Sequence, residues 1–361
     1  MLFKRLFIIL FLFVTLGLEV VVKGGNLSPL LFQLVFNKNI ELRKTDPQTI
    51  NILLLGIGGG KHEGPNLSDT LIFASLNIKD SKITLVSLPR DMWVTELDGR
   101  INTAYARGEA KRKGSGLILA KSVVSKITGQ NIDYGLVIDF SGFEKAVDVL
   151  GGLDITVDRS FDDFEYPIEG KENDPCDNKE EDLEKLATAS SQLEAFPCRY
   201  ERLRFDKGPN QMNGETALKF VRSRHAKGPE GSDFARSQRQ EKVIGALKNK
   251  AFSLQILNPA KILGLYNTLE QSIDTDVAES EFDDFIKVAQ KLQKAKIQSI
   301  VIDNGDLKDS RGGLLTHPDI SEVYNFEWVL IPRAGKDRYS EIHEYIRCRL
   351  EQEECIISEI P

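Results

Sequence analysis

The stretch that decides the fold begins Ile50-Asn51-Ile52-Leu53-Leu54-Leu55-Gly56-Ile57. Two further apolar runs follow it closely, at residues 70–78 and 82–88. Each run is short, rich in Ile, Leu and Val, and bounded by Gly, Asn or Asp, which predicts a β-strand. The near-continuous apolar content indicates that both faces of these strands are covered.

Charged residues stand where these runs begin and end. A carboxylate opens the second run in Ser68-Asp69-Thr70, and an arginine follows the third in Ser87-Leu88-Pro89-Arg90-Asp91. If the two runs are neighbouring strands, both charges can lie at one rim of a sheet, where open α/β sheets bind ligands. A later cluster of donors comprises Arg222, Arg224, Arg236, Arg239 and Gln240. One carboxylate with many arginines suits a magnesium-bound phosphate or pyrophosphate.

The rest of the chain alternates between strand and helix patterns. Helices are predicted near residues 117–127, 142–150, 233–250, 259–270, 280–294 and 340–350, and strands near 134–140, 153–157, 297–302 and 328–331. This alternation predicts an α/β fold, an αβα sandwich around a central mixed β-sheet. We expect the main domain at residues 49–255, with an acidic excursion at 158–202, and an α/β extension at 256–361.

The N-terminus resembles a membrane anchor. Lys4 and Arg5 precede an apolar run at residues 6–22, in which Glu19 is the only charge. The run is at the short end for a membrane-spanning helix, and the basic flank favours a cytoplasmic N-terminus. Without a small-residue cleavage site, a retained anchor is favoured over a removed signal peptide or a buried core helix. We predict a transmembrane signal anchor at 1–23, a membrane-proximal linker at 24–48, and an extracytoplasmic domain.

Net charge and cysteine content limit the classes of protein to which this chain can belong. The net charge of −7 argues against a nucleic-acid binder, which usually carries a basic excess. Four cysteines in an exported domain permit two disulfides, and we expect the sequence-local pairing Cys176–Cys198 and Cys348–Cys355. The second pair requires the chain to bend, because residues seven apart on a straight helix lie ~10 Å apart along its axis. Metal binding by the cysteines is the weaker interpretation, since the chain has no CxxC motif.

The glycine-rich segment Gly56-Ile57-Gly58-Gly59-Gly60-Lys61 does not match a P-loop. A P-loop needs four residues between its glycines and a Ser or Thr after the lysine, and this segment has neither. We expect these glycines to let the backbone turn tightly off the first strand.

The order of motifs resembles the LytR-CpsA-Psr family over about residues 49–250. The resemblance is carried by Asn51-Ile52-Leu53-Leu54-Leu55-Gly56, Ser68-Asp69-Thr70, Ser87-Leu88-Pro89-Arg90-Asp91, Arg100-Ile101-Asn102-Thr103-Ala104-Tyr105, Asp139-Phe140-Ser141-Gly142-Phe143, Val149-Leu150-Gly151-Gly152, Asn213-Gly214-Glu215-Thr216-Ala217-Leu218, Val221-Arg222-Ser223-Arg224 and Asp233-Phe234-Ala235-Arg236-Ser237-Gln238-Arg239-Gln240. It implies a membrane-anchored phosphotransferase of bacterial envelopes. Such an enzyme transfers a glycopolymer, with its phosphate, from a polyprenyl-pyrophosphate carrier to peptidoglycan.

The resemblance also implies roles for single residues. Asp69 would bind the metal, Mg²⁺, and Arg90 would be the principal catalytic arginine. Asp91 could accept the hydroxyl proton or orient Arg90 by an ion pair, and the second role is favoured. The expected pyrophosphate contacts are Arg222, Arg224, Arg236 and Gln240, with Arg100 where many members carry a lysine. Arg239 shares a helix face with Arg236 and is expected to join them.

One position departs from the family pattern. Gly58 stands where many members have a second carboxylate on the metal side, and we expect Glu63 to supply the missing charge. Two other functions stay open. The same groups would serve a pyrophosphatase that hydrolyses the lipid carrier, or a non-catalytic envelope protein that binds glycan or lipid.

Overall fold

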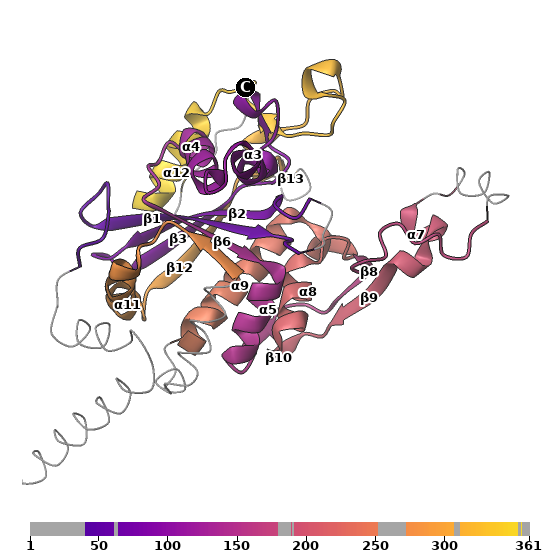
Figure 1. Ribbon diagram of the computed structural model, residues 1–361, viewed down its shortest axis with the longest axis horizontal. Coiled ribbons are helices and arrows are strands. Elements are labelled where there is room, and N and C mark those ends of the chain that lie inside the picture. Colours follow the sequence, from indigo (N-terminus) through magenta and orange to yellow (C-terminus); the bar gives the residue numbers. More distant parts are fainter. Residues whose placement is uncertain are drawn as a thin grey trace, which may run out of the picture.

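A six-stranded mixed sheet forms the centre of the molecule (Figure 1). The computed structural model describes residues 40–60, 64–179, 189, 191–251, 272–306, 311–352 and 355. In spatial order the strands are β11 (Ile273–Thr275), β6 (Tyr134–Asp139), β1 (Thr49–Ile57), β2 (Ser68–Asn77), β3 (Lys82–Ser87) and β12 (Lys296–Val301). Strand β2 is antiparallel to both β1 and β3, whereas β6 runs parallel to β1 and β12 runs parallel to β3. The predicted mixed sheet is confirmed.

The two faces of the sheet are both apolar because successive side chains of a strand point in opposite directions. On β1, Leu53 and Leu55 pack into the core that also contains residues of α4 (Gly116–Thr128). Ile50 packs into a second core that contains Val288 of α11 (Phe282–Lys291). This arrangement explains the near-continuous apolar runs and confirms the prediction that both faces are covered.

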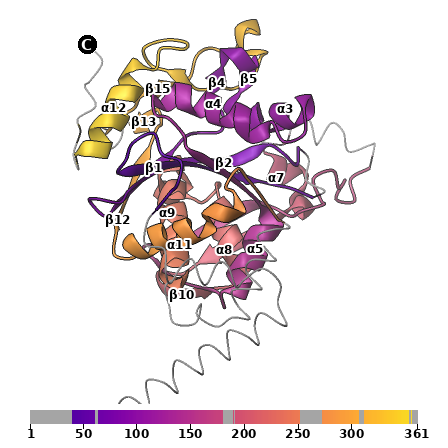
Figure 2. The ribbon, with the colours of Figure 1, turned by 60° about the vertical axis from the view of Figure 1, so that its left-hand side comes forward.

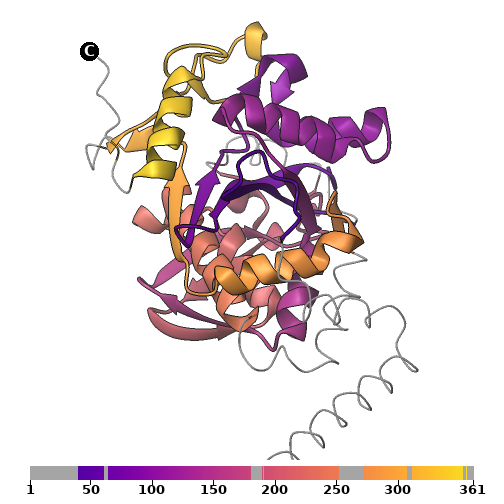
Figure 3. The same ribbon diagram turned by 90° about the vertical axis from the view of Figure 1, so that its left-hand side faces the viewer.

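Helices flank the sheet on both sides, as predicted for an αβα sandwich (Figures 2 and 3). One side carries α3 (Ala104–Lys111), α4 and α12 (Ser340–Glu351), and the other carries α5 (Phe140–Val149), α8 (Gly214–Arg222), α9 (Asp233–Ala251) and α11. The side chain of Asn213 caps α8 and that of Ser232 caps α9. Helix α5 is capped by Asp139, because the chain turns into the helix directly from the end of β6.

The acidic excursion is a projecting arm (Figure 1). It is built from the antiparallel pair β8 (Phe161–Pro167) and β9 (Tyr200–Phe205), with the short helix α7 (Gln192–Ala195) between them. The predicted disulfide Cys176–Cys198 closes it. At its base, the arm shares a core of Phe161, Phe205 and Phe220 with α8 and the neighbouring pair β7 (Leu153–Val157) and β10 (Gly208–Met212).

The region predicted as an extension is built into the main domain instead. Strands β11 and β12 form the two edges of the central sheet, and α12 packs beside α4. Local patterns could not show this, because the strands that pair with β11 and β12 lie far away in the sequence. The predicted second disulfide, Cys348–Cys355, is present, and the bend it needs comes from the end of α12.

Short elements complete the described chain. They are β4 (Trp93–Val94), β5 (Gly99–Arg100), β13 (Gly305–Asp306), β14 (Arg311–Gly312), β15 (Leu315–Thr316), β16 (Ile331–Pro332) and the 3₁₀ turns η1 (Thr95–Leu97), η2 (Ile101–Thr103), η4 (Pro197–Arg199), η5 (Gly228–Gly231), η6 (Glu279–Glu281) and η7 (Glu322–Tyr324). Among the described residues, no helix is long and apolar enough to cross a bilayer. The predicted anchor at 1–23 and the predicted helix at 259–270 lie outside the described residues.

Candidate functional site

One rim of the sheet gathers the polar residues that the sequence singled out. Strand β2 begins at the rim where β1, β3, β6 and β12 end, because it runs antiparallel to its neighbours. Arg90 therefore meets Asp69, with Nη1 lying 2.5 Å from the carboxylate oxygen Oδ1. At the end of β1, Gly59 has a φ of +67°, and a Cβ there would lie 2.7 Å from Cβ of Asp139. The predicted meeting of the two charges and the tight glycine turn are both confirmed.

A chain of ion pairs continues behind Arg90. Asp91 lies with Oδ2 3.7 Å from Nε of Arg90, and its Oδ1 accepts a hydrogen bond from Nη1 of Arg100 at 3.2 Å. Nε of Arg100 also lies 2.9 Å from Oε2 of Glu327. Asp91 thus bridges two arginines, and this position is consistent with the orienting role that the sequence favoured. Arg100 stands behind Arg90 and is not among the residues that line the cavity described next.

A cavity of about 230 Å³ opens beside the Asp69–Arg90 pair. Its lining residues come from the sheet rim, the base of the arm, the end of α8 and the start of α9: Asp69, Thr70, Arg90, Asp163, Glu165, Tyr166, Pro167, Val221, Arg222, Arg224, His225, Arg236 and Gln240. Four arginines and Gln240 thus face one space. This juxtaposition was predicted for Arg90, Arg222, Arg224, Arg236 and Gln240.

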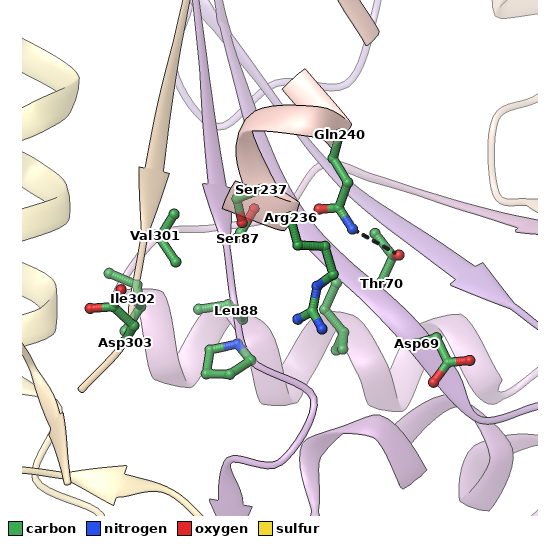
Figure 4. A pocket seen from close by; sticks show the side chains of 12 residues that line it. Asp69, Thr70, Ser87, Leu88, Arg236, Ser237, Gln240, Val301, Ile302 and Asp303 are labelled. Atoms are coloured by element: carbon green, nitrogen blue, oxygen red, sulfur yellow. Dashed lines mark hydrogen bonds between the residues drawn. The ribbon is translucent and has the colours of Figure 1, made fainter. Parts of the chain in front are cut away.

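A smaller pocket of about 20 Å³ continues this space towards the end of β12 (Figure 4). Figure 4 shows Arg236 and Gln240 projecting from α9 towards the rim, with Asp303 on the other side of the pocket. Nε2 of Gln240 donates a hydrogen bond to Oγ1 of Thr70 at 3.3 Å. This bond ties α9 to the start of β2, next to Asp69.

Aromatic rings hold Arg222 in place. Its Cζ lies 4.1 Å from the ring centre of Phe140, and its Nη1 donates to the hydroxyl of Tyr166 at 3.3 Å. Burial raises the pKa of Tyr166 despite the nearby positive charges of Arg222 and Lys219, so the phenol stays neutral at physiological pH. A guanidinium stacked on a ring keeps its charge and its planar fork for an incoming anion.

Arg239 does not belong to the cavity, and its predicted role in pyrophosphate binding is wrong. Its side chain is 3% exposed, and its donors bond the carbonyls of Phe220, Ser223 and Glu230 at 3.0, 2.7 and 2.9 Å. Nη1 also lies 3.3 Å from the carboxylate of Glu230, and burial lowers the pKa of Arg239 to about 10. The guanidinium stays charged at neutral pH and caps the end of α8. Spacing on a helix face could not distinguish it from Arg236, because both lie within one turn.

Sequence reasoning missed Asp163, which organises one wall of the cavity. The residue is 0% exposed, and its carboxylate accepts from the hydroxyl of Ser223 and from the backbone N–H groups of Glu165, Arg224 and His225 at 2.7–3.2 Å. It thereby fixes the segment that carries Arg224 against the base of the arm. The available signal was its two-residue spacing from Phe161, which places a carboxylate on the apolar face of β8.

The described carboxylates do not form a metal site by themselves. In the described ranges, the only cluster with metal-ligand spacing is Asp174 with Cys176 and Cys198, and these cysteines are bonded to each other. Glu63, predicted as the second ligand, lies outside the described residues. Asp69 engages Arg90 through Oδ1, and among the described residues its Oδ2 has no hydrogen bond or ion pair that would compete with a cation. One carboxylate fits Mg²⁺ when substrate phosphates supply further oxygens.

Comparison with known proteins assigns the family. The LytR_cpsA_psr family model matches residues 32–317. TagV of Bacillus subtilis, a polyisoprenyl-teichoic acid–peptidoglycan teichoic acid transferase, is 26% identical over 278 residues, which is 75% of this chain and 60% of that protein. TagU of Bacillus cereus, which bears the same transferase name, is 26% identical over 255 residues, or 69% of this chain and 67% of that protein.

The fold agrees with solved structures. The Lin1025 protein of Listeria innocua superposes with a TM-score of 0.55 at 22% identity, covering 84% of this chain and 98% of that one. The match to TagV spans less than two thirds of that relative's length. The family model matches most of the chain, and the fold and the Asp69–Arg90 rim agree with that match. This chain therefore belongs to the LytR-CpsA-Psr family.

Proposed function

We propose that this chain is a phosphotransferase that moves a glycopolymer, with its phosphate, from a polyprenyl-pyrophosphate carrier to a hydroxyl of peptidoglycan. The carrying observation is the cavity that Arg90, Arg222, Arg224 and Arg236 line together with Asp69. The transferase names of the two Bacillus relatives support the same class of donor and acceptor.

The cavity suits a pyrophosphate in size and charge. About 230 Å³ accommodates the two phosphates, while the lipid and the polymer extend outside it. Guanidinium groups bind phosphate oxygens through two parallel hydrogen bonds and keep their charge at all physiological pH values. We assign Arg222, Arg224 and Arg236 to the two phosphates, and Gln240 to holding α9 against the rim.

Arg90 acts where charge develops. As the acceptor hydroxyl attacks the phosphorus next to the glycan, negative charge grows on the bridging and leaving oxygens. A donor fixed in advance stabilises that charge without reorganising. The carboxylate of Asp91 lies 3.7 Å from Nε of Arg90 and attracts its guanidinium, while Arg100 donates a hydrogen bond to Asp91.

Asp69 and the substrate phosphates would hold Mg²⁺. When bound, the ion neutralises charge on the phosphate oxygens. Glu63 is proposed as a further ligand that compensates for Gly58. The chain itself contributes the position of Asp69, which the register of β1 and β2 sets at the rim.

The predicted anchor at residues 6–22 gives the cavity access to a lipid-linked substrate. We propose a single span with residues from about 24 onward outside the cytoplasm. A reporter fused after Pro361 should behave as exported, and a cytoplasmic signal would contradict this topology.

The full-length chain in detergent micelles tests the function. It is incubated with Mg²⁺, a polyprenyl-pyrophosphate-linked glycan with a labelled sugar, and a peptidoglycan oligosaccharide. We expect label on the oligosaccharide, release of polyprenyl phosphate, and loss of both when EDTA removes the metal. Released glycan phosphate without transfer would favour a pyrophosphatase, and binding without turnover would favour a non-catalytic envelope protein.

A further inference from the structure

The proposed transfer leaves one proton without an acceptor. The attacking hydroxyl must lose a proton as its oxygen bonds phosphorus, and a positioned base speeds such steps by about 10²–10⁴-fold. Asp91 is held by two arginines outside the cavity, and Asp69 faces Arg90. The carboxylate of Asp163 is buried and accepts four hydrogen bonds.

Glu165 on β8 and His225, just after α8, remain as a pair that lines the cavity. Nδ1 of His225 lies 3.9 Å from Oε2 of Glu165, and the two side chains are 58% and 39% exposed. Both residues line the same cavity as Arg90. A histidine with one ring nitrogen turned to a carboxylate leaves the other nitrogen free to accept a proton.

One buried group, the carboxylate of Asp163, fixes the backbone at both residues of this pair. Asp163 accepts the backbone N–H of Glu165 at 3.0 Å through Oδ1 and that of His225 at 3.2 Å through Oδ2. Arg239 adds a second restraint on the same segment by bonding the carbonyl of Ser223. The backbone positions that carry the histidine and its carboxylate are therefore fixed without a substrate.

We propose that His225 is the general base of the transfer and that Glu165 is its positioning residue; the inference rests on the proposed function. The acceptor hydroxyl oxygen bonds the phosphorus next to the glycan while its proton passes to Nε2 of His225. The bond from that phosphorus to the bridging oxygen breaks, and polyprenyl phosphate leaves with the electron pair. Glu165 faces Nδ1 and stabilises the imidazolium that forms.

Charges of both signs line the cavity that contains His225. Glu165 and Asp163 approach from β8, Arg222 and Arg224 from its own segment, Arg236 from α9, and Asp69 and Arg90 from the rim. The carboxylates favour the imidazolium, and the arginines oppose it. Bound pyrophosphate would cancel part of the arginine charge, which favours proton transfer to His225 once the substrate is in place.

The test compares the pH dependence of transfer by the full-length chain and its variants. We expect kcat/KM of the wild type to fall on the acid side of its pH profile, because a base that has gained its proton cannot accept another. In His225→Gln, kcat at neutral pH should fall about 100-fold, and the decrease of kcat/KM on the acid side should disappear. The affinity for the pyrophosphate lipid should stay within about twofold of the wild type. The control His343→Gln, on α12 away from the cavity, should keep both rate and profile.

Two further variants separate a base from a binding residue. Added imidazole should restore about tenfold of the activity lost in His225→Gly, because it can occupy the place of the missing ring. Glu165→Gln should move the acid limb to lower pH, since it removes a charge that favours the imidazolium.

Three results would overturn the proposal. One is a wild-type rate and acid limb in His225→Gln. The second is a His225→Gly variant whose activity imidazole does not restore and whose loss of activity is explained by weaker binding of the pyrophosphate lipid. The third is a wild-type chain that transfers no glycan, which would remove the proposed function as well and so is distinguished from the first two.

Discussion

The two walls of the cavity hold their charged groups in different ways. On the rim wall, the ion pair of Arg90 and Asp69 is partly exposed, with side chains 32% and 37% accessible. On the arm wall, Asp163 is almost fully buried, and so is Arg239, which supports that wall without lining the cavity; both are bonded mainly to backbone groups. Exposed pairs exchange partners at little cost because water screens them, whereas buried pairs are expensive to break.

The difference shows that arginine-rich motifs contain two kinds of arginine. Arg236 and Arg239 lie three residues apart on α9, yet only Arg236 lines the large cavity. Arg239 supports the wall from which Arg222 and Arg224 reach the same space. Replacing Arg239 should therefore mainly lower stability, whereas replacing Arg236 should mainly lower activity.

The largest effect is expected for Arg239→Ala. Removing a buried guanidinium strands the carboxylate of Glu230 and three carbonyls, so the free energy of unfolding should fall by about 4 kcal/mol. Urea denaturation followed by circular dichroism measures this. The matched control Arg236→Ala should change stability by less than about 1 kcal/mol while weakening pyrophosphate binding. Equal destabilisation by both variants would contradict the distinction between the walls.

Arg90→Ala tests the rim wall. Turnover should fall by at least about 100-fold, as when one preorganised donor to a developing charge is removed. Arg90→Lys keeps the charge but loses the planar fork, and should also lose activity. Labelled-glycan transfer is the measurement, and Arg107→Ala, at an exposed position on α3, is the control. Near wild-type turnover in a folded Arg90→Ala variant would remove Arg90 from the mechanism.

The disulfide of the arm tests whether the outer arm only supports the site or takes part in the transfer. Replacing Cys176 and Cys198 by serine opens a loop with a sequence separation of 22, which costs about 3 kcal/mol in the chain-entropy picture. The arm should then become sensitive to limited proteolysis, while transfer falls by less than about tenfold because the base of the arm is held by Asp163. A loss as large as that of Arg90→Ala would place the outer arm in the site itself.

The smallest effect concerns Glu144, on α5 near Arg222. Burial raises the pKa of this carboxyl, and the negative charges of Glu215 and Glu169 add to the shift. Since the folded-state pKa lies above the unfolded-state value, its contribution to stability is complete at low pH and is lost as the pH rises through the folded-state pKa.

Glu144→Gln should therefore be more stable than the wild type at pH 7 by less than about 0.5 kcal/mol, because solvent screens this half-buried group. The difference should vanish near pH 4, where the native carboxyl is protonated. Urea midpoints at the two pH values give the comparison. A variant that is less stable at pH 7 would show that Glu144 has a cationic partner that outweighs its acidic neighbours.

Much of the rim could be predicted from local patterns. A short apolar run with a carboxylate at its start, followed by one with an arginine at its end, places both charges at one rim if the strands are antiparallel. The register of β2 and β3 bears this out. The caps of α8 and α9 were equally local, since Asn213 and Ser232 bond N–H groups within three residues. The anchor at 6–22 and Glu63 stay predictions.

The sequence by itself predicted five of the six strands of the central sheet, the disulfide pairing and the charged residues that meet at the rim, because each depends on side-chain alternation, spacing or neighbours close in the chain. Tertiary structure alone decided that β11 and β12 close the sheet, that Arg239 is buried, and that Asp163 fixes Glu165 beside His225. These outcomes depend on contacts between residues far apart in sequence. Burial converts the same arginine or aspartate from an exchangeable surface charge into a fixed part of the framework.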